Sequence, residues 1–388
     1  MKAGWEIKTL DQIAINLDSR RIPITKSLRA NGIYPYYGAS GIVDYVAEYI
    51  FEGNALLISE DGANLLARST PIAFSASGRY WVNNHAHILQ FSTLTTQRYV
   101  EFYFASISID EFVTGAAQPK LTQAALNSIP IPLPPFSEQL RIVDILDEAF
   151  EGIATAKANA EKNLQNARAV FESHLQAVFR NGADGLGPRC PLESALAVQP
   201  RNGWSPPAEY QTGAGFPVLT LSAVTGFEYG AARVKLTSAP VRENAHYWLI
   251  DGELLITRSN TRELVGHVAI YDGAPSKAIC CDLIMKMMVN PSKADTRFVY
   301  YYLRSPEARE YFTSRAHGAS STMKKIGKAV VQGIPVPLPE LTVQRSIVET
   351  LDALGEETRR LQSIYRRKLA ALDELKKSLL HQAFSGEL

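Results

Sequence analysis

The amino-acid sequence predicts an α+β protein with a pseudo-twofold internal repeat, in which two mixed globular segments are separated by two long antiparallel coiled-coil helices. Three observations lead to this prediction. A proline-rich motif occurs twice, a long helical stretch follows each copy, and strand-forming runs precede each copy in the same order. We place the globular segments at residues 1–136 and 182–339, and the spacer helices at residues 137–181 and 340–388.

The duplicated motif reads IPIPLPPFSEQLRIVDILD at residues 129–147 and IPVPLPELTVQRSIVETLD at residues 334–352. The two copies keep a constant offset of 205 residues. The same offset relates three later pairs, namely Ser173 and Ser378, Leu175 and Leu380, and Phe179 and Phe384. Self-similarity at a period this long indicates a duplicated domain rather than a solenoid of short repeats.

Each copy of the motif begins as an extended segment and continues as a helix. Proline at alternate positions fixes φ and removes backbone donors, which excludes a helix or a central strand. Ser137 in the first copy and Thr342 in the second are suited to begin a helix. The stretches from Ser137 to Arg180 and from Thr342 to Phe384 contain no proline. At 1.5 Å per residue, each helix would be about 65 Å long.

Both helical stretches carry residues at the alternating three- and four-residue spacing that faces the partner in a coiled coil. The first series is Val143, Leu146, Phe150, Ile153, Lys157, Ala160, Leu164, Ala167, Phe171 and Val178. The second is Ile347, Leu351, Leu354, Thr358, Leu361, Tyr365, Lys368, Leu372, Leu375 and Leu379. The alternative is that each stretch is an amphipathic helix lying on its own globular core.

The two globular segments share an order of elements. In the first we expect a turn-rich aromatic stretch at 34–41, a strand at 55–59 with a polar loop at 60–64, strands at 72–75, 80–82 and 86–91, a helix at 98–104 and a polar stretch at 114–123. The second replays this order with a strand at 253–257, a loop at 258–262, a helix at 298–303 and a polar stretch at 318–325. The scaffold is duplicated, and the loops have diverged.

Composition is that of an ordinary globular protein, with 388 residues, 46% of them hydrophobic and 20% charged. This length has room for two or three domains. Cys190, Cys280 and Cys281 show no metal-binding spacing and, with no signal peptide, predict a reducing cytosol. Net charge is +1, but residues 182–339 carry 17 basic and 13 acidic residues. The second globular segment is therefore a better candidate for phosphate contact than the helices.

Sequence motifs for catalysis are missing. There is no P-loop, no methyltransferase signature of the NPP[FY] or DPP[FY] type, and no HExxH. Asp373-Glu374-Leu375-Lys376 matches part of a nuclease signature, but it lies in the middle of a predicted helix. We therefore expect no catalytic residue and no metal ligand in this chain.

The sequence resembles the specificity (S) subunit of type I restriction–modification enzymes over its whole length. The resemblance is carried by the duplicated proline motif at the start of each long helix. Four further runs contribute to it, namely Tyr36–Gly41, Ile58–Ala63, Trp81–His87 and Ile256–Asn260.

The resemblance implies two target-recognition domains, each reading one half of a bipartite, asymmetric DNA target in the major groove. It implies that the partners are two methyltransferase subunits, which modify adenine, and nuclease–translocase (restriction) subunits. S-adenosylmethionine, ATP and Mg²⁺ are then used by those partners, and no cofactor is bound by this chain, which would act in the prokaryotic cytoplasm. The alternative is a coiled-coil scaffold or adaptor that binds only proteins. Salt-dependent DNA affinity would distinguish the two.

The polar loops supply the predicted DNA contacts. In the first segment these are Asn64, Arg68, Gln118 and Lys120. In the second they are Arg258, Ser259, Asn260, Arg262, Ser321, Lys324 and Lys325. Arginine fits guanine O6 and N7, and asparagine fits adenine N6 and N7, whereas lysine more often contacts phosphate. The arginines could also be ordinary surface residues.

Two further features have open interpretations. Glu60 and Asp61 could accept a hydrogen bond from cytosine N4, or they could form a turn. His85 and His87 alternate along a predicted strand and so share one face. For these histidines we favour a structural role or a DNA-facing donor over a metal site, because the sequence offers no evident further ligands.

Overall fold

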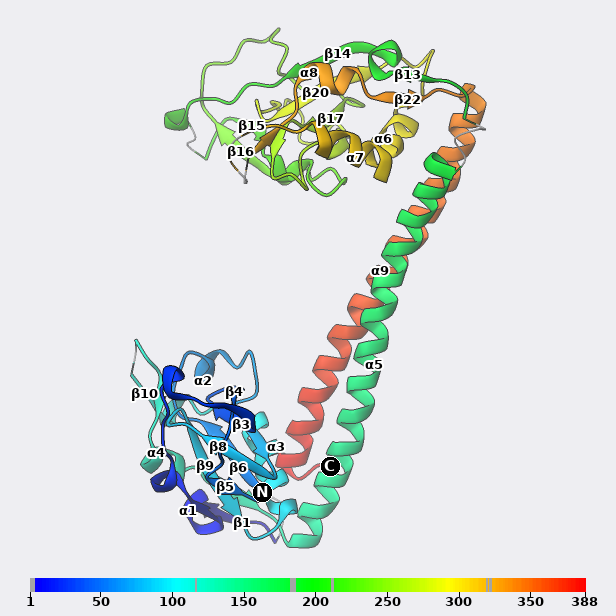
Figure 1. Cartoon of the computed structure of the whole chain (residues 1–388). Helices are drawn as coiled ribbons and strands as arrows, with labels where there is room; N and C mark the ends of the chain where they lie inside the picture. The colour runs from blue at the N-terminus through cyan, green and yellow to red at the C-terminus, as the bar shows by residue number, and fades with distance from the viewer. Residues whose placement is uncertain (1–3, 116, 182–185, 211–212, 319, 321–322) are drawn as a thin grey trace. The chain divides into compact units, whose positions relative to one another are not determined.

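The computed structural model describes residues 4–115, 117–181, 186–210, 213–318, 320 and 323–388 (Figure 1). The chain forms two compact units. Unit 1 contains the residues up to Lys162 together with Tyr365–Leu388, and unit 2 contains Asn163–Ile364. Each unit therefore combines one globular domain with segments of both long helices. Among the described residues, no helix has the length and apolar character needed to cross a membrane.

The domain of unit 1 is built from short strands and a few helices. Its strands are β1 (Glu6–Thr9), β2 (Ala14–Asn16), β3 (Asn31–Gly38), β4 (Gly41–Val46), β5 (Phe51–Glu52), β6 (Ala55–Ser59), β7 (Ala73–Ala76), β8 (Arg79–Val82), β9 (Ala86–Phe91), β10 (Val113–Thr114), β11 (Lys120–Leu121) and β12 (Pro130–Leu133). Its helices are α1 (Leu10–Ile13), α2 (Asn64–Ala67), α3 (Leu94–Ser106) and α4 (Gln123–Asn127), and α5 (Phe136–Gln176) then leaves the domain.

The domain of unit 2 has a similar list of elements. Its strands are β13 (Arg189–Pro191), β14 (Leu196–Asn202), β15 (Phe216–Leu219), β16 (Val234–Thr237), β17 (Leu254–Thr257), β18 (Ser259–Asn260), β19 (Val268–Ile270), β20 (Ile284–Val289), β21 (Lys324–Lys325) and β22 (Pro335–Pro337). Its helices are α6 (Thr296–Arg304), α7 (Pro306–Arg315) and α8 (Lys328–Gln332), and α9 (Leu341–Ser385) follows.

Sheet topology shows that the two domains are copies of one scaffold. The order β2-β9-β6-β7 in unit 1 corresponds to β14-β20-β17-β19 in unit 2, with every neighbouring pair antiparallel. The proline strands β12 and β22 each pair with the first strand of their own domain, β1 and β13. The copies differ in their additions, which are the sheet β4-β3-β8-β5 in unit 1 and the pair β15-β16 in unit 2. The predicted α+β class with an internal repeat is confirmed.

A buried glutamine anchors the start of each long helix. In unit 1, Gln139 donates through Nε2 to the carbonyl of Pro134 at 2.9 Å and accepts the Thr96 hydroxyl of α3 at 2.9 Å. In unit 2, Gln344 donates to the carbonyl of Pro339 at 2.7 Å and accepts the N–H of Asp295, the N-cap residue of α6, at 2.8 Å. Each amide therefore joins the proline segment before its helix, the helix itself and its domain.

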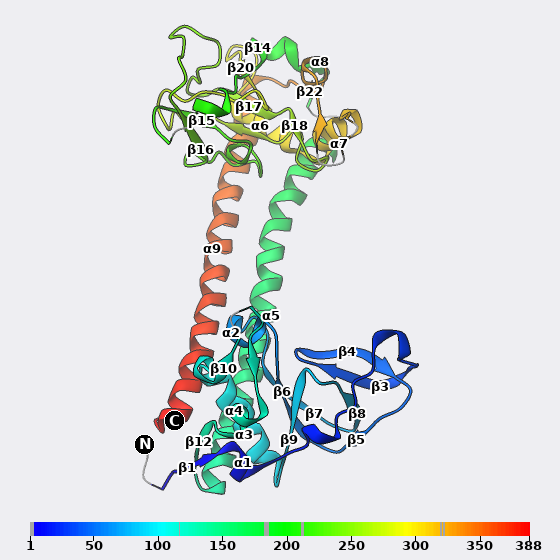
Figure 2. The ribbon, with the colours of Figure 1, turned by 90° about the vertical axis from the view of Figure 1, so that its left-hand side faces the viewer.

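The long helices run antiparallel within unit 1, where they lie side by side in both views (Figures 1 and 2). Lys157 of α5 pairs with Asp373 of α9 at 2.7 Å, and Lys376 lies over the ring of Phe150 at 4.9 Å. Residue numbers therefore rise along α5 as they fall along α9. Leu146 and Leu380 are both in the core of this unit.

The far end of each long helix completes the core of a domain. Phe179, in the short π-helical turn that continues α5, packs in unit 2 against Phe298 and Tyr302 with ring centroids 5.6 and 5.5 Å apart. The equivalent Phe384 of α9 packs in unit 1 against Tyr99 and Tyr103, both at 5.2 Å. The repeat thus extends to the residues that each helix end buries.

The two helix pairs fill the same position with an aromatic residue from opposite helices. In unit 1 this residue is Phe150 of α5, which packs against Phe102 at 5.3 Å. Its repeat partner in α9 is Gly355, and there Phe171 of α5 fills the space, 3.4 Å from where a Gly355 Cβ would stand. An aromatic ring therefore fills the corresponding space in both units, in keeping with a close-packed interior.

The structure differs from two of the sequence predictions about these elements. Leu375, placed in the second heptad series, is 47% exposed, whereas Leu380 and Ala383 are buried, so the heptad assignment is wrong there. A helix of 3.6 residues per turn drifts out of a strict seven-residue register. The aromatic stretch at 34–41, expected to be turn-rich, forms the hairpin β3–β4 with Tyr36 fully buried. The four segment boundaries stay a prediction.

Replacing either anchoring glutamine should destabilise the protein. Gln139→Ala and Gln344→Ala each leave buried backbone or hydroxyl groups unpaired, so each should lower the free energy of unfolding by about 1–3 kcal/mol. Chemical denaturation measures this change. Gln165→Ala, on an exposed part of α5, is the matched control and should change stability by less than about 0.5 kcal/mol. Equal effects at all three positions would contradict the anchoring role.

Candidate nucleic-acid interface

The polar loop after β17 is joined by backbone hydrogen bonds to the segment before α8. Strand β18 (Ser259–Asn260) pairs antiparallel with β21 (Lys324–Lys325). The carbonyl of Arg258 accepts the N–H of Ile326 at 2.9 Å, and its own N–H donates to the carbonyl of Leu283 at 2.9 Å. The two stretches that carry the predicted DNA contacts of the second domain therefore meet in one place.

The side chains of Arg258 and Ser259 differ in their exposure to solvent. Arg258 is half-buried and donates through Nη1 to the carbonyl of Asp282 at 3.3 Å, which is a long hydrogen bond. Ser259 is 1% exposed, and its Oγ has no hydrogen-bond partner among the described residues. Its side chain therefore faces the interior, and its backbone forms the joint with β21.

The other residues of the second domain that we predicted to contact DNA differ in their exposure and in their local hydrogen bonds. Asn260 is half-buried and accepts the next backbone N–H through Oδ1 at 2.9 Å. Arg262 and Lys325 are exposed. Lys324 is half-buried and donates through Nζ to the carbonyl of Gly318 at 2.6 Å. Ser321 lies outside the described residues.

Unit 1 forms the same joint with different side chains. The carbonyl of Glu60 accepts the N–H of Leu121 at 2.8 Å, and its N–H donates to the carbonyl of His85 at 2.9 Å. Glu60 thus holds in unit 1 the place that Arg258 holds in unit 2, and Leu121 corresponds to Ile326. The two domains present the same backbone frame with a different residue at its centre.

The four predicted contacts of unit 1 fall into two pairs. Gln118 and Lys120 are exposed beside the joint, and Lys120 forms a β-bridge with Asp61. Asn64 accepts two hydrogen bonds within its own loop through Oδ1, at 2.8 and 3.1 Å. Arg68 donates to two carbonyls at the end of α3, at 3.0 and 2.9 Å, and burial lowers its pKa. The structure thus brings Gln118 and Lys120 to the joint, whereas Asn64 and Arg68 make local bonds.

A buried ion network lies beneath this joint. Arg21 donates through Nη1 to Glu60 Oε2 at 2.5 Å, and its Nη2 lies 3.4 Å from Asp18 Oδ2. His87 Nδ1 lies 2.5 Å from Asp18 Oδ2, and Lys120 Nζ lies 3.2 Å from Glu60 Oε1. Sequence reasoning missed Asp18 and Arg21, because neither belongs to a motif and their partners are distant in the chain.

Both carboxylates of the network are held in their charged form. Burial by itself raises the pKa of Asp18, but the hydrogen bond and charge of His87, together with Arg21, outweigh burial and hold this pKa below its ordinary value. Burial also raises the pKa of Glu60, and Arg21, His87 and Lys120 together lower it below its ordinary value. The Glu60 carboxylate is therefore committed to internal partners, and the hypothesis that it reads cytosine is not supported.

The two histidines have separate environments. His87 is 1% exposed, and its Nε2 lies 2.9 Å from the carbonyl of Leu121, so it has a structural place. His85 is exposed, with Nδ1 2.8 Å from an Asp61 oxygen. Ligand atoms of Asp18, Glu60 and His87 lie within 4.8 Å of one another, as in a metal site. The Arg21 guanidinium already supplies the positive charge there.

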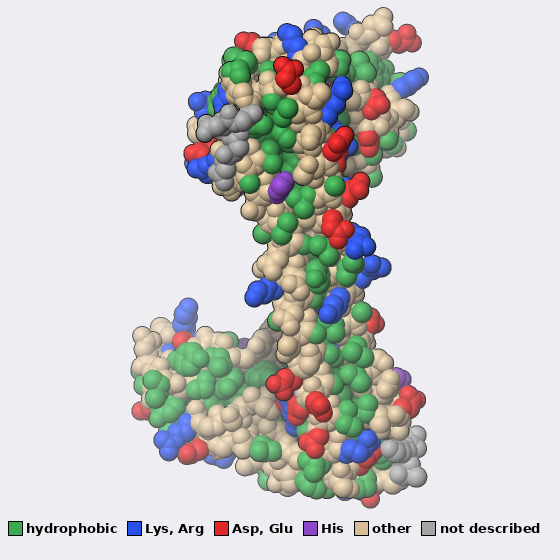
Figure 3. All heavy atoms as spheres, turned by 90° about the vertical axis from the view of Figure 1, so that its right-hand side faces the viewer, with side chains coloured by type: hydrophobic (Ala, Val, Ile, Leu, Met, Phe, Trp, Pro, Cys, Tyr) green, Lys and Arg blue, Asp and Glu red, His purple; other side chains and the backbone are tan. Residues whose placement is uncertain are grey.

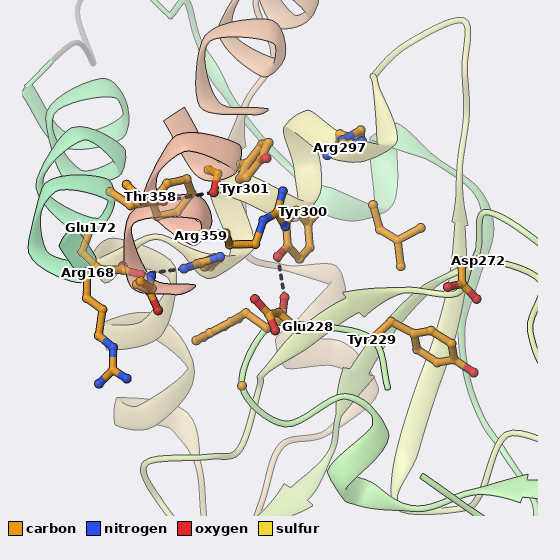
Figure 4. Close-up of a pocket in the computed structure, with 17 residues that line it drawn as sticks. Arg168, Glu172, Glu228, Tyr229, Asp272, Arg297, Tyr300, Tyr301, Thr358 and Arg359 are labelled. Atoms are coloured by element: carbon orange, nitrogen blue, oxygen red, sulfur yellow. Dashed lines mark hydrogen bonds and ion pairs between the residues drawn. The ribbon is translucent and has the colours of Figure 1, made fainter. Parts of the chain in front are cut away.

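A cleft of about 990 Å³ lies in unit 2 beside the helix pair (Figure 4). Several of its polar side chains bond to neighbouring elements. Tyr300 donates to the carbonyl of Phe227, Tyr301 donates to Asp352, and Arg304 pairs with Glu172 at 2.7 Å. This arrangement braces a helix–domain joint.

The run Asp373–Lys376 in α9, which matches part of a nuclease signature, makes contacts typical of an exposed helix surface. The Asp373 carboxylate pairs with Lys157, and this hydrogen bond lowers the pKa of Asp373. Glu374 pairs with Lys377 one turn along the helix, at 2.9 Å. These contacts are those of a charged helix surface.

The hairpin β3–β4 gives the first domain an exposed apolar surface. Ile33 is 79% exposed, and Ile42, Val43 and Tyr45 are each about half exposed. Figure 3 shows apolar side chains gathered on the lobe of unit 1 that carries this hairpin, at the lower left of the view. Contiguous exposed apolar surface commonly marks an interaction site, and the sequence pattern did not predict it.

Comparisons with known proteins agree on one family. The model of the type I restriction modification DNA specificity domain matches residues 2–165 and 238–366. A type I restriction enzyme specificity subunit described from Haemophilus influenzae is 42% identical over 142 residues, covering 37% of this chain and 36% of its own length. The EcoKI specificity subunit of Escherichia coli K12 is 25% identical over 307 residues, covering 72% of this chain and 62% of its own length.

Two solved structures share the fold. A chain from a study of the assembly and conformational transition of the type I R-M system has a TM-score of 0.74 at 18% identity, covering 100% of this chain and 99% of its own. The HsdS subunit of Thermoanaerobacter tengcongensis has a TM-score of 0.58 at 17% identity, covering 100% and 98%. The chain belongs to the family of type I restriction–modification DNA specificity domains. It spans about a third to three fifths of the two curated relatives named above.

The lowered pKa of Asp18 and Glu60 predicts that unit 1 loses stability in acid. A carboxylate whose folded pKa is depressed stabilises the fold above its ordinary pKa, and this stabilisation is lost as pH falls through the folded value. Thermal unfolding from neutral pH to about pH 3 should therefore show a flatter pH dependence in Glu60→Gln than in the unchanged chain. The exposed Glu52, paired with Arg79, gives the control Glu52→Gln. Parallel profiles for Glu60→Gln and the unchanged chain would refute the prediction.

Proposed function

We propose that this chain is the specificity subunit of a type I restriction–modification complex, itself non-catalytic, and that it reads a bipartite, asymmetric DNA target. The observation that carries the proposal is the duplicated joint at Glu60 and Arg258. Each copy places a polar loop beside a lysine-bearing segment, which is a suitable arrangement for base contact next to phosphate contact. Membership of the specificity-domain family supports the same function.

The differences between the domains support an asymmetric target. Both joints use the same backbone hydrogen bonds, but Glu60 stands in one and Arg258 in the other. The additions also differ, since unit 1 carries the hairpin β3–β4 and unit 2 carries β15–β16. Because direct readout depends on the side chains that reach base edges, the two domains should read different half-sites.

Partners and cofactors form the second part of the proposal. The complex would contain two methyltransferase subunits, which use S-adenosylmethionine, and restriction subunits, which use ATP and Mg²⁺, whereas this chain binds no cofactor itself. The repeat supports two equivalent docking places. Val170 of α5 and Leu375 of α9 stand 205 residues apart, and they are apolar but 50% and 47% exposed. An exposed apolar residue at the same position of each copy suits two copies of one partner subunit.

A DNA-binding assay separates this function from that of a protein-binding scaffold. The chain, assembled with its methyltransferase partner, should bind duplex containing its target with an affinity that falls steeply as salt rises. Each neutralised phosphate contributes a slope of about −0.9 in a plot of log affinity against log salt. Binding that is absent, or that does not depend on salt, would favour the scaffold.

Arg258 offers a test at the level of one residue. If its guanidinium reads a base, Arg258→Ala should weaken target binding by about 1–3 kcal/mol and relax one base position. Genome-wide mapping of methylated sites measures the relaxed position. Arg345→Ala, exposed on α9, is the control and should leave the methylated sequence unchanged. Unchanged specificity in Arg258→Ala would remove this residue from the base-reading set.

A further inference from the structure

The residues beneath the joint of unit 1 tie together segments that are far apart in the chain. The Arg21 guanidinium donates to the Glu60 carboxylate at 2.5 Å and to the carbonyl of Ala86 at 2.9 Å, and its Nε donates to the carbonyl of Asp18 at 3.2 Å. One planar fork thus fixes the end of β6, the start of β9 and the turn after β2 relative to one another. Its rigid geometry suits a role in positioning.

His87 extends the network to the strand that carries Lys120. Its two ring nitrogens face oxygen acceptors, namely Asp18 Oδ2 at 2.5 Å and the carbonyl of Leu121 at 2.9 Å. Since Leu121 follows Lys120 directly in β11, the buried imidazole ring holds the strand from which this exposed lysine projects.

Among the described residues, the second domain makes the equivalent joint without such a network. Strand pairing places His87 opposite Ile58 in unit 1 and Met285 opposite Ile256 in unit 2, so Met285 stands where His87 does. Arg258 replaces Glu60 there, as described above. The fold itself therefore does not require the buried charges of unit 1.

Buried ion networks are a weak source of stability. Removing charges from water costs free energy that mutual attraction repays only in good geometry, and well-packed apolar residues often serve equally well. The best-attested benefit of such a network is that it fixes one arrangement among several. In unit 1 the arrangement that it fixes is the position of the loop after Glu60 against the Gln118–Lys120 segment.

We propose that this network, with Arg21 as its central positioning residue, sets the DNA specificity of the first recognition domain. The proposal rests on the proposed function and adds a determinant for one half of the target. Arg21 does not contact DNA in this role. It holds Glu60, which in turn holds the two segments that reach the bases and phosphates.

A bipartite target supplies its own internal control. The full chain is expressed with its methyltransferase partner as unchanged protein, Arg21→Gln and Arg21→Lys, and the methylated sequence is mapped across the genome. Consider sites with a mismatch in the half of the target that the first domain reads. Relative to the correct site, Arg21→Gln should methylate these sites roughly tenfold more than the unchanged chain does, because the variant no longer discriminates against the mismatch. The other half should stay fully discriminated. Arg21→Lys keeps the charge but loses the fork, so it should give a smaller rise in the same half.

A control variant measures the general effect of losing a buried ion pair. Glu253 pairs with Lys286 at 2.7 Å in unit 2, at the opposite end of β17 from the polar loop. Glu253→Gln should reduce the amount of folded protein without relaxing either half of the target.

The alternative results are distinct. If Arg21→Gln leaves both halves as selective as before, or relaxes both halves equally, the positioning role is refuted. If methylation falls only in proportion to the folded protein recovered, and the selectivity of the remainder is unchanged, the network is a stability element and the proposal fails. If the unchanged chain directs no sequence-specific methylation at all, the proposed function fails first, before any variant is compared.

Discussion

The arrangement of this protein depends on a side-chain amide buried at the start of each long helix. Gln139 and Gln344 each donate to a carbonyl of the proline segment and accept from a group at the start of a domain helix. An amide both donates and accepts in this way, whereas an ionised carboxylate has no donor and a leucine has neither. The direction in which each helix leaves its domain follows from this bond. The packing of α5 against α9 depends on that direction in turn.

Much of the scaffold could be predicted from the sequence because repetition gives independent copies of each signal. Proline spacing predicted the extended segments, the absence of proline predicted α5 and α9, and an apolar run predicted β6 to the residue. The offset of 205 residues also related Phe179 to Phe384, which pack against equivalent aromatic residues. These features depend on local backbone chemistry and on the periodic spacing of buried residues, and both can be identified from a single sequence.

The candidate site could be predicted only in part. The polar loop after a buried strand gave Arg258 and Asn260 as candidates, and the polar stretch 114–123 gave Lys120. The structure brings these residues to the joints, and their contact with DNA stays a prediction. The network of Asp18 and Arg21 could not be predicted, since it joins residues that are separated by up to about one hundred positions and carry no spacing rule. The heptad assignment of Leu375 was wrong for a different reason. A few tens of degrees of helix rotation decide which apolar residues face the partner helix.

The exchange of helix ends between the two units has a consequence for biosynthesis. Unit 2 is a continuous stretch, Asn163–Ile364, whereas the core of unit 1 includes Leu380 and Ala383, with Phe384 packed against it. The ribosome makes these residues only after all of unit 2 has been made. Although chains generally fold from the N-terminal domain onward, here the second domain is the first that can be completed. Until then Tyr99 lacks the aromatic partner that it has in the finished protein, so the nascent first domain leaves part of its core incomplete while unit 2 is made.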